Sequence, residues 1–239
     1  MTLYDESPFD FVDPGSEESS YPELFKRFLD QLPKSSVVLD VGCGPGRDLA
    51  GAVARRKTTF GIDQSLFSVK RARRFAPVVC ADATRLPVRS RSANGVILDG
   101  VAHHTRDPFS SLAEAARVLL PGGSLYFAVY KNRGYYPLVY RFPGALFRWI
   151  ARTPFGRRGL NRFAVPLYGW LHRARRRVHR SPEAIRNLFA DYFLTPIASF
   201  HSRAEVETWA RACGMALKEY DQFPSGNCHL FVFEKPPSP

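Results

Sequence analysis

The residues with the clearest chemical potential form a glycine-rich turn and an acid that follows it along the chain. The turn, residues 40–46, reads DVGCGPG. Glycines two residues apart let the backbone approach a ligand closely and leave N–H groups available to bind it. Asp63 comes 21 residues after Gly42, a spacing at which a carboxylate can accept hydrogen bonds from both hydroxyls of a ribose. The pattern predicts a binding site for a cofactor that contains a nucleoside.

Two common nucleotide-binding motifs are absent from this region. The dinucleotide fingerprint G-x-G-x-x-G needs a glycine at the position of Arg47, so NAD is disfavoured. There is no Gly-Lys-Ser/Thr sequence, so ATP bound through a Walker motif is excluded. An alternative is that the glycines only make turns and the acids only cap helices. We disfavour it because strand, turn, helix, strand and acid occur together in the order that a cofactor site requires.

The elements around the turn alternate between short buried strands and helices of about ten residues. This alternation predicts a parallel, doubly wound α/β sheet. A capping box, SRAE at 202–205, begins a last helix, and Gly214 ends it before two strands that form a hairpin. The predicted strands are the VVLDV run before the turn, 58–63, 77–81, 95–99, 124–129, 215–221 and 228–234; the predicted helices are 22–31, 47–57, 65–75, 110–120 (stopped by PGG) and 205–213.

Four segments carry a resemblance to a known family: VVLDVGCGPG, GID, CADATRLPVRSRSANGVILDGVAHH and RVLLPGGSLYFAVY. In this order and spacing they resemble the motifs of class I S-adenosylmethionine-dependent methyltransferases over about residues 36–130. They are most similar to the type 11 domain group, which includes quinone-biosynthesis and wobble-uridine tRNA methyltransferases. The resemblance implies a Rossmann-like, seven-stranded sheet whose last two strands form an antiparallel C-terminal hairpin. With the pattern above, it predicts an N-terminal arm and helix (1–35), a cofactor-binding core (36–130), a mainly helical insertion after the fifth strand (131–200) and a C-terminal helix and hairpin (201–239).

The resemblance also implies which residues contact S-adenosylmethionine and its product S-adenosylhomocysteine. The first glycine turn would line the methionine portion, the end of the second strand the ribose, and the end of the third strand the adenine, while the residues after the fourth strand would close the site. The expected cofactor-binding residues are Asp40, Gly42, Cys43, Gly44, Asp63, Gln64, Asp82, Ala83, Gly100 and Val101.

Methyl transfer requires little from the protein beyond positioning and exclusion of water, because the sulfonium is already activated. A general base helps only where the nucleophile is a neutral hydroxyl or a protonated amine. His103 and His104 follow the fourth strand and are the expected catalytic residues, although they could equally pack the turn. No spacing of histidines with carboxylates predicts a metal site. The side chains expected near the acceptor are Tyr130, Tyr135, Tyr136, Arg141, Tyr192 and His201.

The net charge of +12 is distributed unevenly. Residues 1–25 hold seven acids and no lysine or arginine, whereas residues 131–180 hold thirteen lysines and arginines and no acid. Aromatic residues interleave with the arginines of this basic block. The block could be a lid over a small acceptor, an RNA-binding surface or an interfacial membrane anchor. The remaining alternative is a solvated basic face over an ordinary apolar core.

These observations predict a methyltransferase that acts on an oxygen or nitrogen atom of a small molecule, such as a secondary metabolite or a lipid-like acceptor. The alternative is a tRNA-modifying enzyme that holds RNA with the basic insertion. A methyltransferase-like protein that only binds ligands is disfavoured by the intact Asp63 and Asp82. The sequence has no apolar run long enough to span a membrane and no basic and apolar start typical of a signal peptide, and its four cysteines show neither paired metal spacing nor the density of a disulfide scaffold. We therefore expect a cytoplasmic protein.

Overall fold

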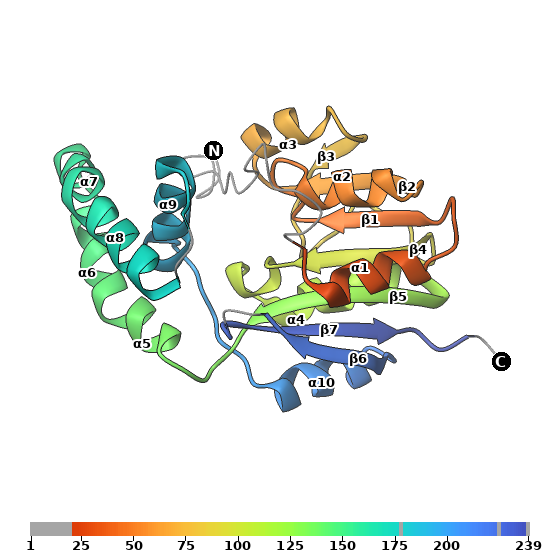
Figure 1. The fold of residues 1–239 in the computed structure, drawn as a ribbon. Helices are drawn as coiled ribbons and strands as arrows, with labels where there is room; N and C mark the ends of the chain where they lie inside the picture. The colour runs from red at the N-terminus through yellow and green to blue at the C-terminus, as the bar shows by residue number, and fades with distance from the viewer. Residues whose placement is uncertain (1–20, 177–178, 224–225, 238–239) are drawn as a thin grey trace.

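The computed structural model describes residues 21–176, 179–223 and 226–237 (Figure 1). The acidic arm of the sequence, residues 1–20, lies outside this described part. The strands are β1 Val37–Val41, β2 Thr58–Asp63, β3 Val78–Cys80, β4 Ala93–Asp99, β5 Leu119–Tyr130, β6 Ala216–Gln222 and β7 Cys228–Glu234. The helices are α1 Glu23–Gln31, α2 Arg47–Ala54, α3 Leu66–Ala72, the 3-10 turn η2 Ala102–His104, α4 Pro108–Val118, α5 Tyr136–Arg141, α6 Pro143–Ile150, α7 Pro154–Gly159, the π turn η3 Leu160–Ala164, α8 Val165–Arg176, α9 Pro182–Phe189, the π turn η4 Ala190–Leu194 and α10 Arg203–Ala212.

The strands form one seven-stranded sheet in the order β3-β2-β1-β4-β5-β7-β6. The pairs from β3 to β5 are parallel, and β7 is antiparallel to both β5 and β6. This confirms the predicted doubly wound sheet with a reversed C-terminal hairpin. The predicted capping box is also present, because the Ser202 hydroxyl accepts a bond from Glu205 N while the Glu205 carboxylate accepts one from Ser202 N.

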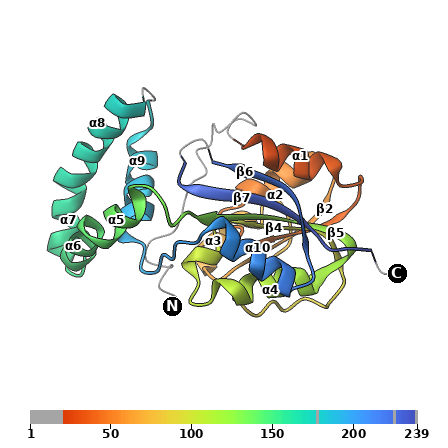
Figure 2. The same ribbon diagram turned by 90° about the horizontal axis from the view of Figure 1, so that it is seen from below.

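Both faces of the central strands β1, β4 and β5 are buried, which explains why these strands read as nearly continuous apolar runs. Along β5, Phe127 packs with residues of α4 and α10 on one face, whereas Tyr126 packs with α1 and α2 on the other. Both rings are fully buried. Figures 1 and 2 show helices on both sides of the sheet. The core therefore lies in two layers, and the carboxyl edge of the parallel strands is left to carry a site.

The fifth strand is longer than predicted. The predicted helix 110–120 was expected to stop at the PGG sequence of 121–123, but α4 ends at Val118 and PGG lies within β5. The pairing with β4 jumps from Ala93 opposite Leu119 to Gly95 opposite Ser124, so the extra residues bulge out of the ladder. Gly122 has a φ of 76°, which favours glycine at this bulge.

The chain between β5 and α10 folds as helices beside the carboxyl ends of the parallel strands (Figures 1 and 2). The chain leaves and re-enters the sheet domain at one point, where His201 N donates to Tyr130 O and Asn132 N donates to His201 O. Tyr130, Tyr136 and Tyr140 form a buried cluster that packs the first of these helices against the end of β5. The helical insertion is thus placed next to the edge that carries the predicted site residues.

Candidate functional site

The glycine turn at the end of β1 has a conformation that requires glycine. Gly42, Gly44 and Gly46 all have positive φ, and a Cβ at Gly42 would lie 2.2 Å from a methyl carbon of Val101. Gly44 N donates a 2.9 Å hydrogen bond to Asp63 Oδ2, and Ser65 N donates a 2.8 Å bond to Asp63 Oδ1. The turn after β1 and the end of β2 are therefore tied together through one carboxylate.

Asp40 is a buried carboxyl group that has an unused acceptor. The residue is 2% exposed, and its Oδ2 has no hydrogen-bond partner among the described residues. Burial and the carboxylates of Asp48 and Asp99 raise the pKa of Asp40 well above its ordinary value, although Arg47 opposes them. An unpaired acceptor of this kind indicates a missing donor, because buried polar atoms otherwise find partners.

Arg47 forms a partly buried ion-pair network that was not among the predicted contacts. Its Nε lies 2.8 Å from Asp48 Oδ1 and its Nη2 lies 2.8 Å from Asp99 Oδ2. These contacts join the start of α2 to the end of β4. Burial and Asp48 raise the pKa of Asp99 to about 6 despite the arginine. The available sequence signals were Arg47 in place of the third glycine and Asp99 at the end of a strand.

The other predicted cofactor residues follow the ends of β2, β3 and β4 at the same edge of the sheet. Asp82 is exposed, and its Oδ1 accepts bonds from the backbone N and the hydroxyl of Thr84. Gly100 has a φ of 74°, and a Cβ there would meet no atom within 4 Å. Burial raises the pKa of the Cys43 thiol above its ordinary value, so this thiol stays protonated. Gln64 and Ala83 adjoin Asp63 and Asp82, and both are partly exposed.

A second cluster joins the sheet to the insertion. Tyr130, the last residue of β5, donates a 2.8 Å hydrogen bond from its hydroxyl to Asp191 Oδ1. His104, in η2 after β4, places its Nε2 3.7 Å from the same carboxylate oxygen. Its Nδ1 lies 2.8 Å from Ile197 O, and because a carbonyl can only accept, Nδ1 carries the proton and Nε2 is the acceptor. Residues from β5, η2 and η4 thus converge on one carboxyl group.

The electrostatics of this cluster single out Asp191. Burial raises the pKa of Asp191 to about 7, although the hydrogen bond from Tyr130 opposes the rise. Burial also lowers the pKa of His104 to about 4, against the opposing effect of its bond to Ile197. His104 is therefore neutral at pH 7, and Asp191 is the group that exchanges a proton near neutrality. Asp191 was not among the predicted site residues, although it is one of only two acids between residues 131 and 200.

The two adjacent histidines have different surroundings. His103 is 1% exposed, its ring lies 3.6 Å from that of Tyr130 between centroids, and its Nδ1 accepts a bond from Tyr130 N. Its Nε2 has no hydrogen-bond partner in the described part of the chain. These contacts favour a packing role for His103, whereas His104 faces the Asp191 carboxyl group.

The side chains predicted to lie near the acceptor divide into three groups. Tyr136 and Tyr192 lie with Tyr130 in one aromatic cluster, and Asn227 donates a hydrogen bond to the Tyr192 hydroxyl. His201 is instead held by Ser199 and Glu205 at the start of α10. Tyr135 and Arg141 are exposed on the surface.

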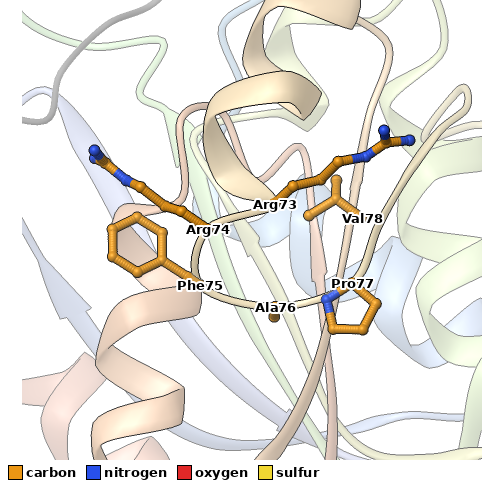
Figure 3. A pocket seen from close by; sticks show the side chains of 6 residues that line it. All are labelled: Arg73, Arg74, Phe75, Ala76, Pro77 and Val78. Atoms are coloured by element: carbon orange, nitrogen blue, oxygen red, sulfur yellow. The ribbon is translucent and has the colours of Figure 1, made fainter.

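A separate hollow lies at the turn between α3 and β3 (Figure 3). It is lined by the six consecutive residues 73–78, and the side chains of Arg73 and Arg74 point apart along its rim. None of the residues that the sequence predicted for the cofactor or the acceptor lines it. We therefore locate the candidate site at the carboxyl edge of β1, β2 and β4 and not in this hollow.

Comparison with known proteins shows which family matches the segment that forms this edge. Residues 39–127 match the family described as "Methyltransferase domain". Residues 39–127 form a methyltransferase domain. The matched residues run from β1 to β5, so they contain the glycine turn, Asp63, Asp82 and both histidines. The resemblance found in the sequence is therefore confirmed.

Among curated proteins, the chain is similar to a mouse tRNA (carboxymethyluridine(34)-5-O)-methyltransferase, ALKBH8, with 36% identity over 130 residues that cover 50% of this chain and 19% of the relative. It is also similar to a malonyl-[acyl-carrier protein] O-methyltransferase of Marinomonas, with 34% identity over 116 residues, 44% of this chain and 43% of the relative. The chain thus spans less than half the length of either relative.

A solved structure shares the fold at low sequence identity. It is the 1,6-didemethyltoxoflavin-N1-methyltransferase of Burkholderia thailandensis, with a TM-score of 0.56 and 15% identity over 90% of this chain and 77% of that one. That crystal structure contains 1,6-didemethyltoxoflavin and S-adenosylhomocysteine. At this identity the likeness shows the fold alone.

The residues of the methyltransferase domain fit the cofactor that the family uses. The unpaired Oδ2 of Asp40 offers an acceptor for the ammonium group of the methionine portion. Asp63 lies at the end of the adjacent strand, as the ribose hydroxyls require. These residues would hold S-adenosylmethionine.

We expect Asp63→Ala to weaken the binding of S-adenosylmethionine and S-adenosylhomocysteine by at least about tenfold. Two charge-assisted hydrogen bonds to the ribose contribute about 1.5–3 kcal/mol each, so their loss is enough for this effect. Asp63 also holds the turn through Gly44 N. Titration calorimetry measures both affinities. The matched control is Asp107→Ala, which removes the carboxylate that caps α4 and should leave both affinities unchanged. A wild-type protein that binds neither compound contradicts the assignment.

Proposed function

We propose that this protein transfers a methyl group from S-adenosylmethionine to an oxygen or nitrogen atom of a small acceptor molecule. The observation that carries the proposal is the buried cluster of Tyr130, Asp191 and His104 between the sheet and the insertion. The Asp191 side chain is 15% exposed, and the hydroxyls of Tyr130 and Tyr136 donate to its carboxylate and its backbone carbonyl. Little of this carboxyl group is open to an acceptor, which favours a small molecule over a large one.

The proposed roles follow from the contacts in the cluster. The bound cofactor supplies a methyl group that is already activated on a sulfonium. Asp191 takes the proton from an acceptor hydroxyl as its oxygen attacks, or from an acceptor ammonium before the resulting amine attacks, because its pKa of about 7 places it near the optimum for a base at neutral pH. Tyr130 orients the carboxylate through its hydrogen bond, and His104 presents an acceptor nitrogen beside it. Enclosure by the insertion excludes water from the reacting groups.

A tRNA is the second candidate acceptor, and two observations favour it. Residues 131–180 hold thirteen lysines and arginines without an acid, and several relatives of this chain are tRNA methyltransferases. The malonyl-[acyl-carrier protein] and toxoflavin-type relatives act on other acceptors, as their names state. The location of Asp191 in an enclosed cluster leads us to place the small acceptor first.

The direct test uses cofactor with a labelled methyl group and an extract separated into RNA and small-molecule fractions. We expect label to be transferred to the small-molecule fraction, at a rate that falls when Asp191 is replaced. Transfer of label to the tRNA fraction alone would reverse the order of the two candidates. Transfer to neither, from a protein that binds the cofactor, would contradict both.

The salt dependence of activity separates the same candidates independently. A tRNA that makes six or more phosphate contacts loses roughly 10³-fold in affinity between about 50 and 200 mM salt, because each contact releases counterions. A small acceptor meets at most one or two arginines, so we expect its apparent affinity to change only a few-fold. Replacing the exposed Arg152, Arg158 and Arg162 with glutamine should then leave the rate nearly unchanged. A steep salt slope that this variant abolishes would favour tRNA.

A further inference from the structure

Large apolar side chains are exposed at helical spacing on the outer helices of the insertion. On α5 and α6 they lie four, four and three residues apart, and along η3 and α8 they lie four, three and one residue apart. Such spacings place Leu146 and Trp149 on one face of α6, and Leu167, Trp170 and Leu171 on one face of α8. We call these two sets, with Phe155 of α7, the outer apolar stripes: Leu138, Phe142, Leu146 and Trp149; Phe163, Leu167, Trp170 and Leu171; and Phe155.

The outer apolar stripes are not needed for the core of the insertion. The opposite faces of the same helices already pack inward, because Phe147 of α6 and Tyr168 of α8 both contact the ring of Phe189. A Cβ at Gly169 of α8 would lie 3.0 Å from Ile185, so α8 and α9 are in close contact. Helices α6 and α8 therefore each have two apolar faces. One face packs inside the insertion, and the other, which carries an outer apolar stripe, is exposed.

The exposure of these side chains is unusual for a surface without a partner. Phe155 is 86% exposed, Trp149 66% and Trp170 64%, and none of the exposed apolar side chains described outside the insertion exceeds 57%. Single exposed apolar residues are common on proteins, but two stripes with an aromatic residue between them indicate a binding surface.

The charge around the stripes defines what the partner must offer. No acid occurs between residues 131 and 180, and the exposed arginines include Arg152, Arg158 and Arg162 on and beside α7 and η3. The partner must therefore be anionic and apolar at once. RNA meets the first condition but not the second, since leucines cannot stack on bases. A bilayer of anionic lipid meets both, with phosphates for arginine and acyl chains for leucine and phenylalanine.

We propose that the outer apolar stripes bind the surface of an anionic membrane, with the helices lying in the plane of the headgroups. Arginine, tryptophan and phenylalanine on short amphipathic helices are the residues that favour this boundary. No helix in the described part of the chain has both the length and the apolar character to cross a bilayer, so the contact would be peripheral. Helices α6, α7 and α8 lie farther from the sheet than α9, which leaves them accessible to a flat surface (Figures 1 and 2). This proposal does not depend on the identity of the methyl acceptor.

The test is co-sedimentation of the full chain with vesicles of phosphatidylcholine that contain phosphatidylglycerol, beside vesicles of phosphatidylcholine alone. We expect strong binding to the anionic vesicles and weak binding to the neutral ones. The variant Trp149→Ser, Phe163→Ser, Leu167→Ser should bind at least about tenfold more weakly, because three apolar groups no longer enter the bilayer. The matched control, Phe60→Ser, Leu66→Ser, Val79→Ser, removes three exposed apolar groups from β2, α3 and β3 and should bind as the wild type does.

The charge contribution is tested separately. Each arginine removed from the membrane-facing surface should cost about fivefold in binding to anionic vesicles, so the triple Arg152→Gln, Arg158→Gln, Arg162→Gln variant should lose roughly 100-fold. The control triple, Arg73→Gln, Arg74→Gln, Arg85→Gln, carries the same change in net charge at exposed positions of the sheet domain and should lose much less.

Tryptophan fluorescence then locates the contact. Trp149 and Trp170 are exposed on the stripes, whereas Trp209 packs against His201 and Phe109. We expect a blue shift on binding that disappears when Trp149 and Trp170 are both replaced by phenylalanine. The proposal is overturned if the wild type does not bind anionic vesicles, if the stripe variant binds as well as its control, or if the stripes instead hold two copies of the chain together in size-exclusion chromatography. Binding of tRNA by the wild type, without binding of anionic vesicles, would assign the arginines to RNA instead.

Discussion

Replacing Asp191 with asparagine is expected to lower the rate of methyl transfer at saturating cofactor by about 10²-fold or more. Asparagine keeps an oxygen that can accept the hydrogen bond from Tyr130, but it cannot take a proton from the acceptor. In the wild type the rate should rise with pH up to about 7 and then level off, because only the ionised carboxylate is a base. Initial rates across this pH range measure both effects, and the rise should vanish in the variant.

Tyr130→Phe provides a matched control that keeps the buried ring and removes only its hydroxyl. The hydrogen bond from Tyr130 lowers the pKa of Asp191, so its loss should move the rise in rate to higher pH. A base role therefore predicts a shifted profile in Tyr130→Phe and a flat one in Asp191→Asn. Unchanged profiles in both variants would remove Asp191 from proton transfer.

The stability of the Asp191→Asn variant distinguishes a chemical role from a structural one. Burial raises the pKa of Asp191 in the folded protein from 3.8 to about 7, so the folded state binds the proton more tightly than the unfolded state. The wild type therefore loses stability from this group as pH rises from about 4 to about 7, by up to ~4 kcal/mol. Asparagine does not ionise, so the variant should be at least as stable as the wild type at pH 8. A variant that is slow because it is unfolded would show the opposite.

The sheet could be predicted from sequence because its signals are local. A parallel strand covered on both faces must be apolar at consecutive positions, as Leu125 to Val129 are, and a turn that binds a nucleoside must contain glycines. The capping box at Ser202 was readable for the same reason, since both of its hydrogen bonds span three residues. The PGG sequence was predicted to stop a helix but lies in a bulge of β5. The sequence does not distinguish the two cases, because a bulge is defined by the pairing of β5 with β4.

The acceptor cluster depends on contacts that no local pattern records. Asp191 meets Tyr130 across 61 residues of sequence, and their contact exists only because η4 packs against the end of β5. His103 and His104 are identical in type and adjacent in the chain, so sequence alone could not separate them. The turn of η2 directs one ring against Tyr130 and the other towards Asp191. Such assignments require the packing of the insertion on the sheet.

The contact between Arg47 and Asp99 also depends on packing between distant segments that no local pattern records. Replacing Arg47 with methionine is expected to lower the free energy of unfolding by about 1–3 kcal/mol, as measured by denaturant titration, because Arg47 and Asp99 are only partly buried. Methionine fills much of the volume but leaves the carboxyl groups of Asp48 and Asp99 without the cation that lies 2.8 Å from each. Removing one partner of a buried ion pair costs more than the pair contributes, because the remaining charge stays desolvated.

The decisive comparison is a double-mutant cycle with Asp99→Asn. If Arg47 serves mainly to neutralise the carboxyl groups, the double variant Arg47→Met, Asp99→Asn should lose less unfolding free energy than the two single variants together. In the double variant only Asp48 remains without its cation, because Asp99 has been replaced by a neutral side chain. Strict additivity would mean that the two side chains do not act as a pair. Arg47 also lowers the pKa of Asp40, so its loss should favour the protonated form of that carboxyl group. A protonated Asp40 is a poorer acceptor for an ammonium group, and cofactor affinity should therefore fall in Arg47→Met even where the protein remains folded.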